Sequence, residues 1–246
     1  MNLTLKDIAR IERKARLNPK ILEGMSEYEQ ASAAQAIVAM RDEEYEKDAW
    51  LWAKEQVWTK DEASNQVLPF PSDKEYVHDL FDALETCPLL AIPKSRRMFI
   101  TWGITIFLTH RLRYRKHYAG FIQSSTEDKA AFVIDQRMAF IENTLAPIYR
   151  REYKANRTVQ GKIGTMTYLQ TGSYGKALAQ GADAFRTYTP TFVFLDEVDF
   201  MEKGHESFVA TLPFAEKKCQ IVLVSTSNGP QGVIADMARS IGFVRF

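Results

Sequence analysis

The chain has 246 residues, of which 46% are apolar and 26% charged, and its formal net charge at pH 7 is +1. This apolar content is ample for a sizeable core, in one large domain or two small ones. Because the charges nearly cancel, the composition excludes a protein that binds nucleic acid through its overall charge, so any contact with DNA has to come from local basic patches.

The sequence carries no sign of a membrane segment or of an oxidising compartment. No stretch reaches the roughly 20 apolar residues of a membrane span, and the N-terminus lacks the apolar core of a signal peptide. The two cysteines, Cys87 and Cys219, lie far apart and have no metal-ligand spacing around them. We therefore expect a soluble intracellular protein with reduced thiols and no membrane contact.

Residues 1–60 predict a helical N-terminal region, because charged and apolar residues alternate there at helical spacing. The acidic run at 42–44 fits a solvated helix face. A polar stretch that ends in a Pro-Phe-Pro run at 69–71 predicts a linker into the main domain, residues 61–246. Phe70 has two uses open to it: packing against the core, or stacking on an adenine base.

The rest of the chain alternates helical and strand patterns. Helices are expected at residues 73–86, 102–117, 127–145, 204–217 and 231–241, and strands at residues 89–92, 118–123, 162–170, 192–195 and 221–224. This alternation predicts an α/β fold of the P-loop NTPase type, with a largely parallel central sheet flanked by helices.

Two basic groups leave their function open. The first closes the expected helix at 110–117, where cations favour the helix dipole but also suit a phosphate backbone. The second group fits either a solvated loop or a surface that faces DNA. It comprises Arg150, Arg151, Lys154, Arg157 and Lys162.

A basic turn between the strand at 89–92 and the helix at 102–117 is the first candidate site. This order is that of a phosphate-binding (Walker A) loop, which presents backbone N–H groups to phosphate, adds a cation and places a hydroxyl on a divalent metal. The window comprises Lys94, Ser95, Arg96, Arg97, Met98, Phe99, Ile100 and Thr101. Only the final hydroxyl fits the usual pattern, since both glycines are missing and Ile100 stands in the lysine position. A plain basic surface turn is the alternative.

Two carboxylates, Asp196 and Glu197, follow the apolar run at 192–195 and form the second candidate site, of Walker B type. Ligands of open α/β sheets gather at the carboxyl ends of such strands. We expect Asp196 to hold Mg²⁺ through its water shell and Glu197 to orient and deprotonate the water that attacks a γ-phosphate. Solvated acids at a strand end are the alternative. Arg186 could stabilise charge on the transferring phosphate, or it is a surface charge.

The strand at 221–224 ends in small polar residues, Ser225, Thr226, Ser227 and Asn228. Such side chains at the carboxyl edge of a sheet can hydrogen-bond a γ-phosphate or its attacking water, so they can sense hydrolysis. An ordinary turn is the alternative.

The joint order of these motifs resembles the large terminase subunit of tailed bacteriophages. The resemblance spans about residues 66–235 and rests on five segments, at 69–71, 92–102, 181–190, 194–201 and 225–229. Members of that family combine a P-loop ATPase domain with a ribonuclease-H-like nuclease domain. Several of them carry the phosphate-binding lysine at the front of the loop, as Lys94 does, whereas the bulky Phe99 departs from their pattern.

The resemblance implies a role for each candidate residue. Thr101 and Asp196 would hold Mg²⁺ beside ATP, and Glu197 would be the catalytic carboxylate. Arg186 would be the arginine finger, and residues 225–228 would couple hydrolysis to movement.

The resemblance also implies a motor that hydrolyses ATP to drive double-stranded DNA into a procapsid. Its implied partners are DNA, the portal protein and the small terminase subunit. It would form a homo-oligomeric ring on the procapsid, in the cytoplasm of the infected bacterial host, although an isolated domain can be monomeric.

Because the chain ends at Phe246, we expect an ATPase domain without a nuclease domain, which hydrolyses ATP but does not cut DNA. Two alternatives stay open. One is a degenerate nucleotide-binding module that assembles without turnover, and the other is a different nucleic-acid translocase, such as a helicase-like protein.

Overall fold

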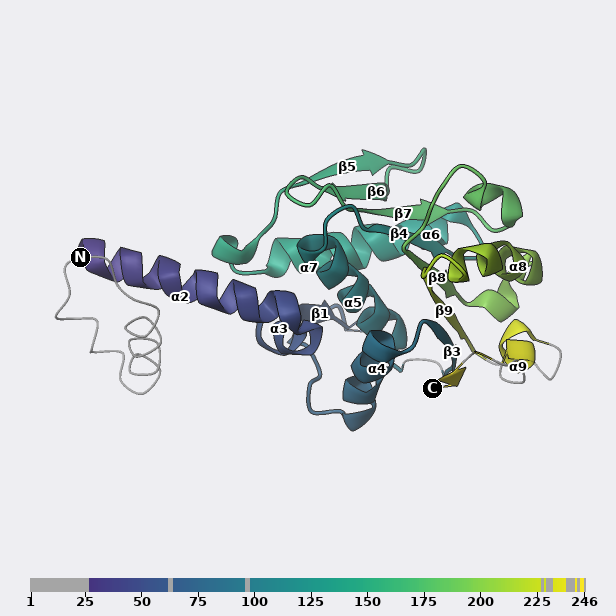
Figure 1. Cartoon of the computed structure of the whole chain (residues 1–246), viewed down its shortest axis with the longest axis horizontal. Coiled ribbons are helices and arrows are strands. Elements are labelled where there is room, and N and C mark those ends of the chain that lie inside the picture. Colours follow the sequence, from purple (N-terminus) through teal and green to yellow (C-terminus); the bar gives the residue numbers. More distant parts are fainter. Residues whose placement is uncertain are drawn as a thin grey trace.

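The computed structural model of the chain describes residues 27–61, 64–95, 98–226, 228, 232–237, 242 and 244–245. Figure 1 shows a twisted central sheet with helices on both faces, and the long helix α2 (Glu27–Lys47) reaches away from this body. The predicted α/β architecture with helices before the sheet is confirmed.

Within the described residues, the main sheet has eight strands in the order β10-β3-β9-β8-β4-β7-β6-β5. Neighbours from β10 to β7 are parallel, and β7, β6 and β5 pair antiparallel. The strands are β3 (Leu89–Pro93), β4 (Ala119–Gln123), β5 (Tyr153–Arg157), β6 (Ile163–Tyr168), β7 (Tyr174–Leu178), β8 (Phe192–Asp196), β9 (Gln220–Ser225) and β10 (Val244–Arg245). Because β3, β9 and β8 are parallel neighbours, their carboxyl ends meet at one edge.

Successive residues of the central strands point to opposite faces of the sheet, so these strands are apolar almost throughout. In β8, Phe192 and Phe194 join the larger core, which α3 to α7 complete, and Val193 and Leu195 join a smaller core under α8 and α9. The helices are α3 (Ala49–Gln56), α4 (Glu75–Thr86), α5 (Ile100–Tyr114), α6 (Glu127–Val133), α7 (Ala139–Thr144), α8 (Gly204–Ala215) and α9 (Val233–Met237).

Among the helices that the structure describes, none has both the length and the apolar character that a membrane crossing requires.

The helix expected at 127–145 forms, but a π-helical turn, η2 (Ile134–Met138), separates α6 from α7. The Thr126 hydroxyl caps its start by accepting a hydrogen bond from Lys129 N at 3.2 Å. Single π turns inside α-helices are frequent at functional sites. Here the turn carries Arg137 to a pocket described below.

The N-terminal helices belong to the same packed body as the sheet. Tyr45 and Trp52 are 1% and 0% exposed in the larger core, and His110 Nε2 donates to the Tyr45 carbonyl oxygen at 2.6 Å. Asp42 accepts a hydrogen bond from Tyr114 Oη at 2.7 Å, so the acidic run is only partly solvated. A domain boundary at residue 60 stays a prediction.

The stretch expected to be a linker contains structure of its own. Strand β1 (Trp58–Lys60) pairs antiparallel with β2 (Val67–Pro69). Phe70 follows β2, is 4% exposed and packs edge-on against Phe81. Core packing, rather than stacking on a base, is therefore the use that the structure gives to Phe70.

The basic segments differ from their expected form. Arg111 is paired with Glu85, and Arg113 is buried in an ion pair with Glu142, so neither guanidinium is available to a phosphate backbone. These side chains face inward because they lie in the last turn of a helix that is buried nearly all round. The second basic group is not a loop, since its middle forms strand β5, with Lys154 and Arg157 exposed.

Candidate active site

The candidate phosphate loop connects β3 to α5. Strand β3 ends at Pro93, and α5 begins at Ile100 with Thr101 in its first turn, which is the predicted order. At the start of the loop, Lys94 N donates to the Ser225 carbonyl oxygen at 2.9 Å. This hydrogen bond ties the loop to the tip of β9.

The end of the loop is strained. Phe99 occupies the N-cap position of α5 with φ at 27°, a region that residues other than glycine rarely adopt. Its ring stacks on that of Trp102, with centroids 6.3 Å apart. Ser95 is exposed, whereas Arg96 and Arg97 lie outside the described residues.

Four predicted residues meet at the carboxyl edge of the sheet. Lys94 Nζ lies 2.8 Å from Glu197 Oε1, although the two residues are 103 positions apart. Thr101 Oγ1 donates to Asp196 Oδ1 at 3.3 Å. Asp196 is the last residue of β8, and Glu197 turns the chain with φ at 56°. The spatial meeting of loop and carboxylates, on which the site prediction depends, is present.

Charges around Asp196 act in opposite directions on its carboxyl group. Burial is the largest influence and raises the pKa of Asp196 above its ordinary value. The cations of Lys94 and Arg137 and the Thr101 hydroxyl lower this pKa, and the neighbouring Glu197 carboxylate raises it. A partly buried carboxylate with two cations nearby can hold a divalent cation when it is ionised.

The polar segment after β9 contacts the carboxylates. Ser225 is buried, and Thr226 N donates to Glu197 Oε2 at 3.3 Å. Asn228 contacts Asp199, through Nδ2 to the Asp199 carbonyl oxygen at 3.2 Å. Ser227 lies outside the described residues.

Arg186 is not part of this cluster. Its side chain is 77% exposed and its Nε lies 2.9 Å from Asp183 Oδ1. Arg186 follows the short 3₁₀ helix η4 (Ala182–Phe185), which comes after the carboxyl end of β7.

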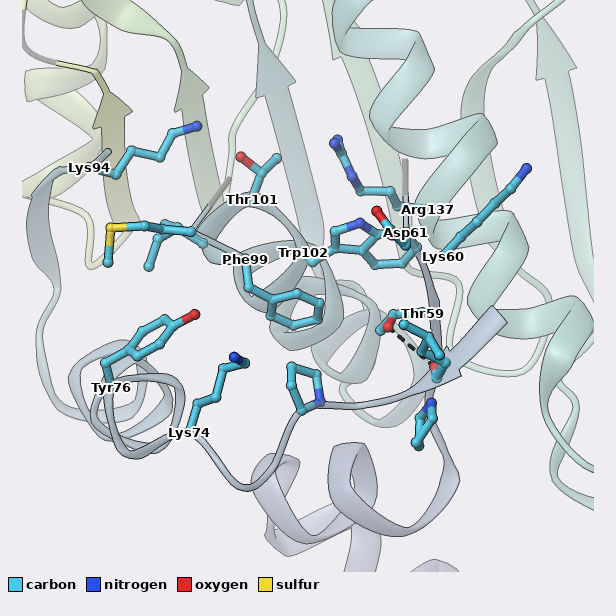
Figure 2. Close-up of a pocket in the computed structure, with 15 residues that line it drawn as sticks. Thr59, Lys60, Asp61, Lys74, Tyr76, Lys94, Phe99, Thr101, Trp102 and Arg137 are labelled. Carbon is cyan, nitrogen blue, oxygen red and sulfur yellow. Dashed lines mark hydrogen bonds between the residues drawn. The ribbon is translucent and has the colours of Figure 1, made fainter. Parts of the chain in front are cut away.

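A pocket of about 570 Å³ opens beside Lys94 and Thr101. Figure 2 shows these two residues on one side, Lys74 and Tyr76 on another, and the β1 residues Thr59 and Lys60 opposite. The full lining is Thr59, Lys60, Asp61, Leu68, Pro69, Pro71, Lys74, Tyr76, Lys94, Met98, Phe99, Ile100, Thr101, Trp102 and Arg137. The pocket is of the size that small-molecule ligands occupy.

Sequence reasoning missed two residues of this region. Arg137 lines the pocket and acts on Asp196, but in the sequence it is one arginine within a long helical pattern. Asp199 contacts the segment after β9 and belongs to the 3₁₀ helix η5 (Val198–Phe200). The only signal for Asp199 was its place shortly after the two acids.

Solved structures with the same fold are large terminases of phages. An arginine-to-alanine mutant of the large terminase ATPase domain of Thermus phage P74-26 matches 67% of this chain and 68% of its own, at 15% identity and a TM-score of 0.52. The large terminase of bacteriophage HK97 matches 81% of this chain and 43% of its own, at 13% identity and a TM-score of 0.59. That of a thermophilic bacteriophage matches 70% and 44%, at 13% identity and a TM-score of 0.51.

No protein-family model matches the sequence. The matched region spans less than half of two of the three terminases and about two thirds of the third. The chain therefore has the fold of phage large terminase ATPase domains, a P-loop NTPase fold, and the resemblance seen in the sequence is confirmed at the level of the fold.

Proposed function

We propose that this chain is the ATPase domain of a viral DNA-packaging motor, which hydrolyses Mg-ATP to move double-stranded DNA into a procapsid. The observation that carries the proposal is the meeting of Lys94, Thr101, Asp196 and Glu197 beside the pocket, in a fold shared with terminase ATPase domains.

The phosphates of ATP belong at the start of α5, where the loop of residues 94–101 enters the helix. The first amides of a helix and its dipole attract anions. The Lys94 ammonium, 12% exposed, adds a full charge, and the loop arginines Arg96 and Arg97 add more. The neighbouring lining of Thr59, Lys74 and Tyr76 leaves space for the nucleoside.

Mg²⁺ would be held by Thr101 and Asp196. Magnesium prefers oxygen ligands at about 2.0–2.1 Å in an octahedron, so adjacent ligand oxygens lie about 3 Å apart. The Thr101 hydroxyl and the Asp196 carboxylate oxygen are 3.3 Å apart, which fits this donor set. Mg²⁺ bound there would neutralise charge on the phosphates.

Glu197 is the general base of the proposed reaction. Water attacks the γ-phosphorus, its proton passes to the Glu197 carboxylate, and the bond to the β,γ-bridging oxygen breaks to release ADP and phosphate. Without nucleotide, Glu197 is paired with Lys94 at 2.8 Å. A triphosphate that draws Lys94 to itself would release the carboxylate for the water.

Motor activity follows from assembly in this proposal. Arg186 is exposed, which is what an arginine finger that enters a neighbouring subunit's site requires. A homo-oligomeric ring, the portal protein and the small terminase subunit complete the motor, and residues 225–228 couple hydrolysis to movement.

Hydrolysis assays on the full chain test the proposal. Glu197→Gln keeps the shape of the side chain but removes the base, so kcat should fall about 10²–10⁴-fold. Lys94→Ala should weaken binding of a non-hydrolysable ATP analogue. The matched controls are Glu202→Gln and Lys54→Ala, two exposed residues outside the site. Equal kcat in wild type, Glu197→Gln and Lys94→Ala would refute the ATPase.

A nucleotide-binding module without turnover is the second candidate. The strained Phe99, which lines the pocket where terminases often have glycine, favours it. This candidate predicts that wild type binds the ATP analogue but shows no hydrolysis above the Glu197→Gln variant.

A further inference from the structure

One side chain joins the turn after Glu197 to the end of the described chain. Asp199 Oδ1 accepts a hydrogen bond from Ile234 N at 3.0 Å, and Oδ2 accepts one from Asn228 N at 3.4 Å. The Asp199 carbonyl oxygen accepts from Asn228 Nδ2 at 3.2 Å, and Asp199 N donates to Ser225 Oγ at 3.2 Å. Asp199 is thus bonded on every side to the segment that follows β9.

Gly232 shows how closely this contact is built. A Cβ atom at Gly232 would lie 2.4 Å from Asp199 Oδ2 and 2.7 Å from Asp199 Cγ, distances that real Cβ atoms essentially never show. The Gly232 carbonyl oxygen accepts from Asp236 N at 3.0 Å and so begins α9. Since glycine has no side chain to cap the helix, Asp199 supplies the cap from a distant part of the sequence.

The same segment contacts both charged groups of the proposed active site. Thr226 N donates to Glu197 Oε2 at 3.3 Å, and the Ser225 carbonyl oxygen accepts from Lys94 N at 2.9 Å. The position of the Glu197 carboxylate therefore depends on this segment, and Asp199 is the residue that fastens the segment to the turn.

We propose that Asp199 is a positioning residue for ATP hydrolysis. It holds the turn that carries Glu197 and the segment 225–237 together, so that the carboxylate and α9 move as one unit. Asp199 does not line the pocket in this role and acts only through Glu197. The proposal rests on the proposed function.

Steady-state kinetics on the full chain give the first test. In Asp199→Ala the Glu197 carboxylate loses its support, and kcat should fall at least about tenfold, because small misplacements of reacting groups are costly. The KM for ATP should change less than about twofold, since Asp199 touches no part of the pocket. Asp199→Asn keeps one acceptor oxygen on its side chain, so its kcat should lie between the two.

Gly232→Ala approaches the same contact from the other side. Its new methyl group displaces the Asp199 carboxylate, so kcat should fall as in Asp199→Ala. In the double variant Gly232→Ala adds no further loss, because the atoms that its Cβ would meet are gone. Additive losses would show that the two residues act separately and would overturn the proposal.

Amide hydrogen exchange of the nucleotide-free protein separates positioning from general unfolding. In Asp199→Ala the Ile234 amide should exchange faster while the amides of β8 keep their protection. Unchanged exchange at Ile234, or loss of protection throughout β8, contradicts the proposal.

The failure of this inference differs from that of the proposed function. A wild type without hydrolysis would refute the proposed function and with it the role of Asp199. An active wild type together with an equally active Asp199→Ala variant would refute only the role of Asp199.

Discussion

Two cation–carboxylate pairs in this molecule use the same chemistry for different ends. Arg113 and Glu142 are 0% and 1% exposed, and Glu142 also accepts from Tyr168 Oη at 2.9 Å and from Arg151 N at 3.2 Å. Lys94 and Glu197 are 12% and 35% exposed and border a pocket. The first pair is saturated and closed, whereas a ligand can reach and break the second. Exposure and spare hydrogen-bonding capacity, rather than residue type, separate a structural ion pair from a candidate catalytic one.

The electrostatics of the buried pair support this distinction. Burial alone would lower the pKa of Arg113, but the Glu142 carboxylate and nearby tyrosines raise it above its ordinary value. Arg113 Nη2 also donates to the Tyr149 carbonyl oxygen at 2.7 Å. Each charge in this network is therefore compensated within the core.

The largest effect is expected from breaking the buried pair. Glu142→Ala leaves the Arg113 guanidinium buried without its carboxylate, which should lower the free energy of unfolding by about 3–5 kcal/mol. Urea denaturation measures this loss. Glu202→Gln, an exposed change, is the control, and a loss below about 1 kcal/mol would show that the core pair is not a structural one.

A second buried group should make stability depend on pH. Burial lowers the pKa of His110 to about 3, below its ordinary value, so the unfolded chain binds a proton that the folded one does not. Stability should therefore rise with pH between about 3 and 6.5, by about 1.4 kcal/mol per unit. Urea denaturation at several pH values should show that His110→Gln removes this slope. His205→Gln, at an exposed histidine, should retain it.

A smaller loss is expected at the start of α6. Thr126→Ala removes the hydroxyl that accepts from Lys129 N and should cost about 1 kcal/mol of stability. Thr126→Ser keeps a hydroxyl and serves as the control. Equal melting temperatures for the Ala and Ser variants would contradict the cap.

The smallest loss of stability is expected at the accessible pair. Lys94→Ala breaks its ion pair with Glu197, yet the free energy of unfolding should change by less than about 1 kcal/mol because the pair is partly solvated. Thermal unfolding of this variant beside Lys54→Ala tests it. A loss as large as that of Glu142→Ala would erase the distinction between the two pairs.

The sequence predicted the parts of the fold that local pattern determines. Apolar runs that ended in polar residues marked β3, β8 and β9, and their parallel arrangement followed from the helices between them. The meeting of Lys94 with Glu197 was predicted for the same reason, since parallel strands share a carboxyl edge.

Tertiary contacts explain what the sequence did not predict. Strand β5 is polar because it lies at the edge of the sheet, so it has no apolar run to detect. Arg113 looked like a surface cation, and only its pairing with Glu142 shows that it is buried. Asp199 has a role only because Ile234 reaches it across 35 positions of sequence.

The π-helical turn between α6 and α7 sets the facing of Arg137. A π turn accommodates one residue more than an α turn, and each residue of an α-helix advances by about 100°. Deleting one residue from Ile134–Met138 would restore a regular helix and rotate everything beyond the deletion by that angle. The guanidinium now beside the pocket would then swing around the helix axis, so a single codon controls whether Asp196 has its second cation.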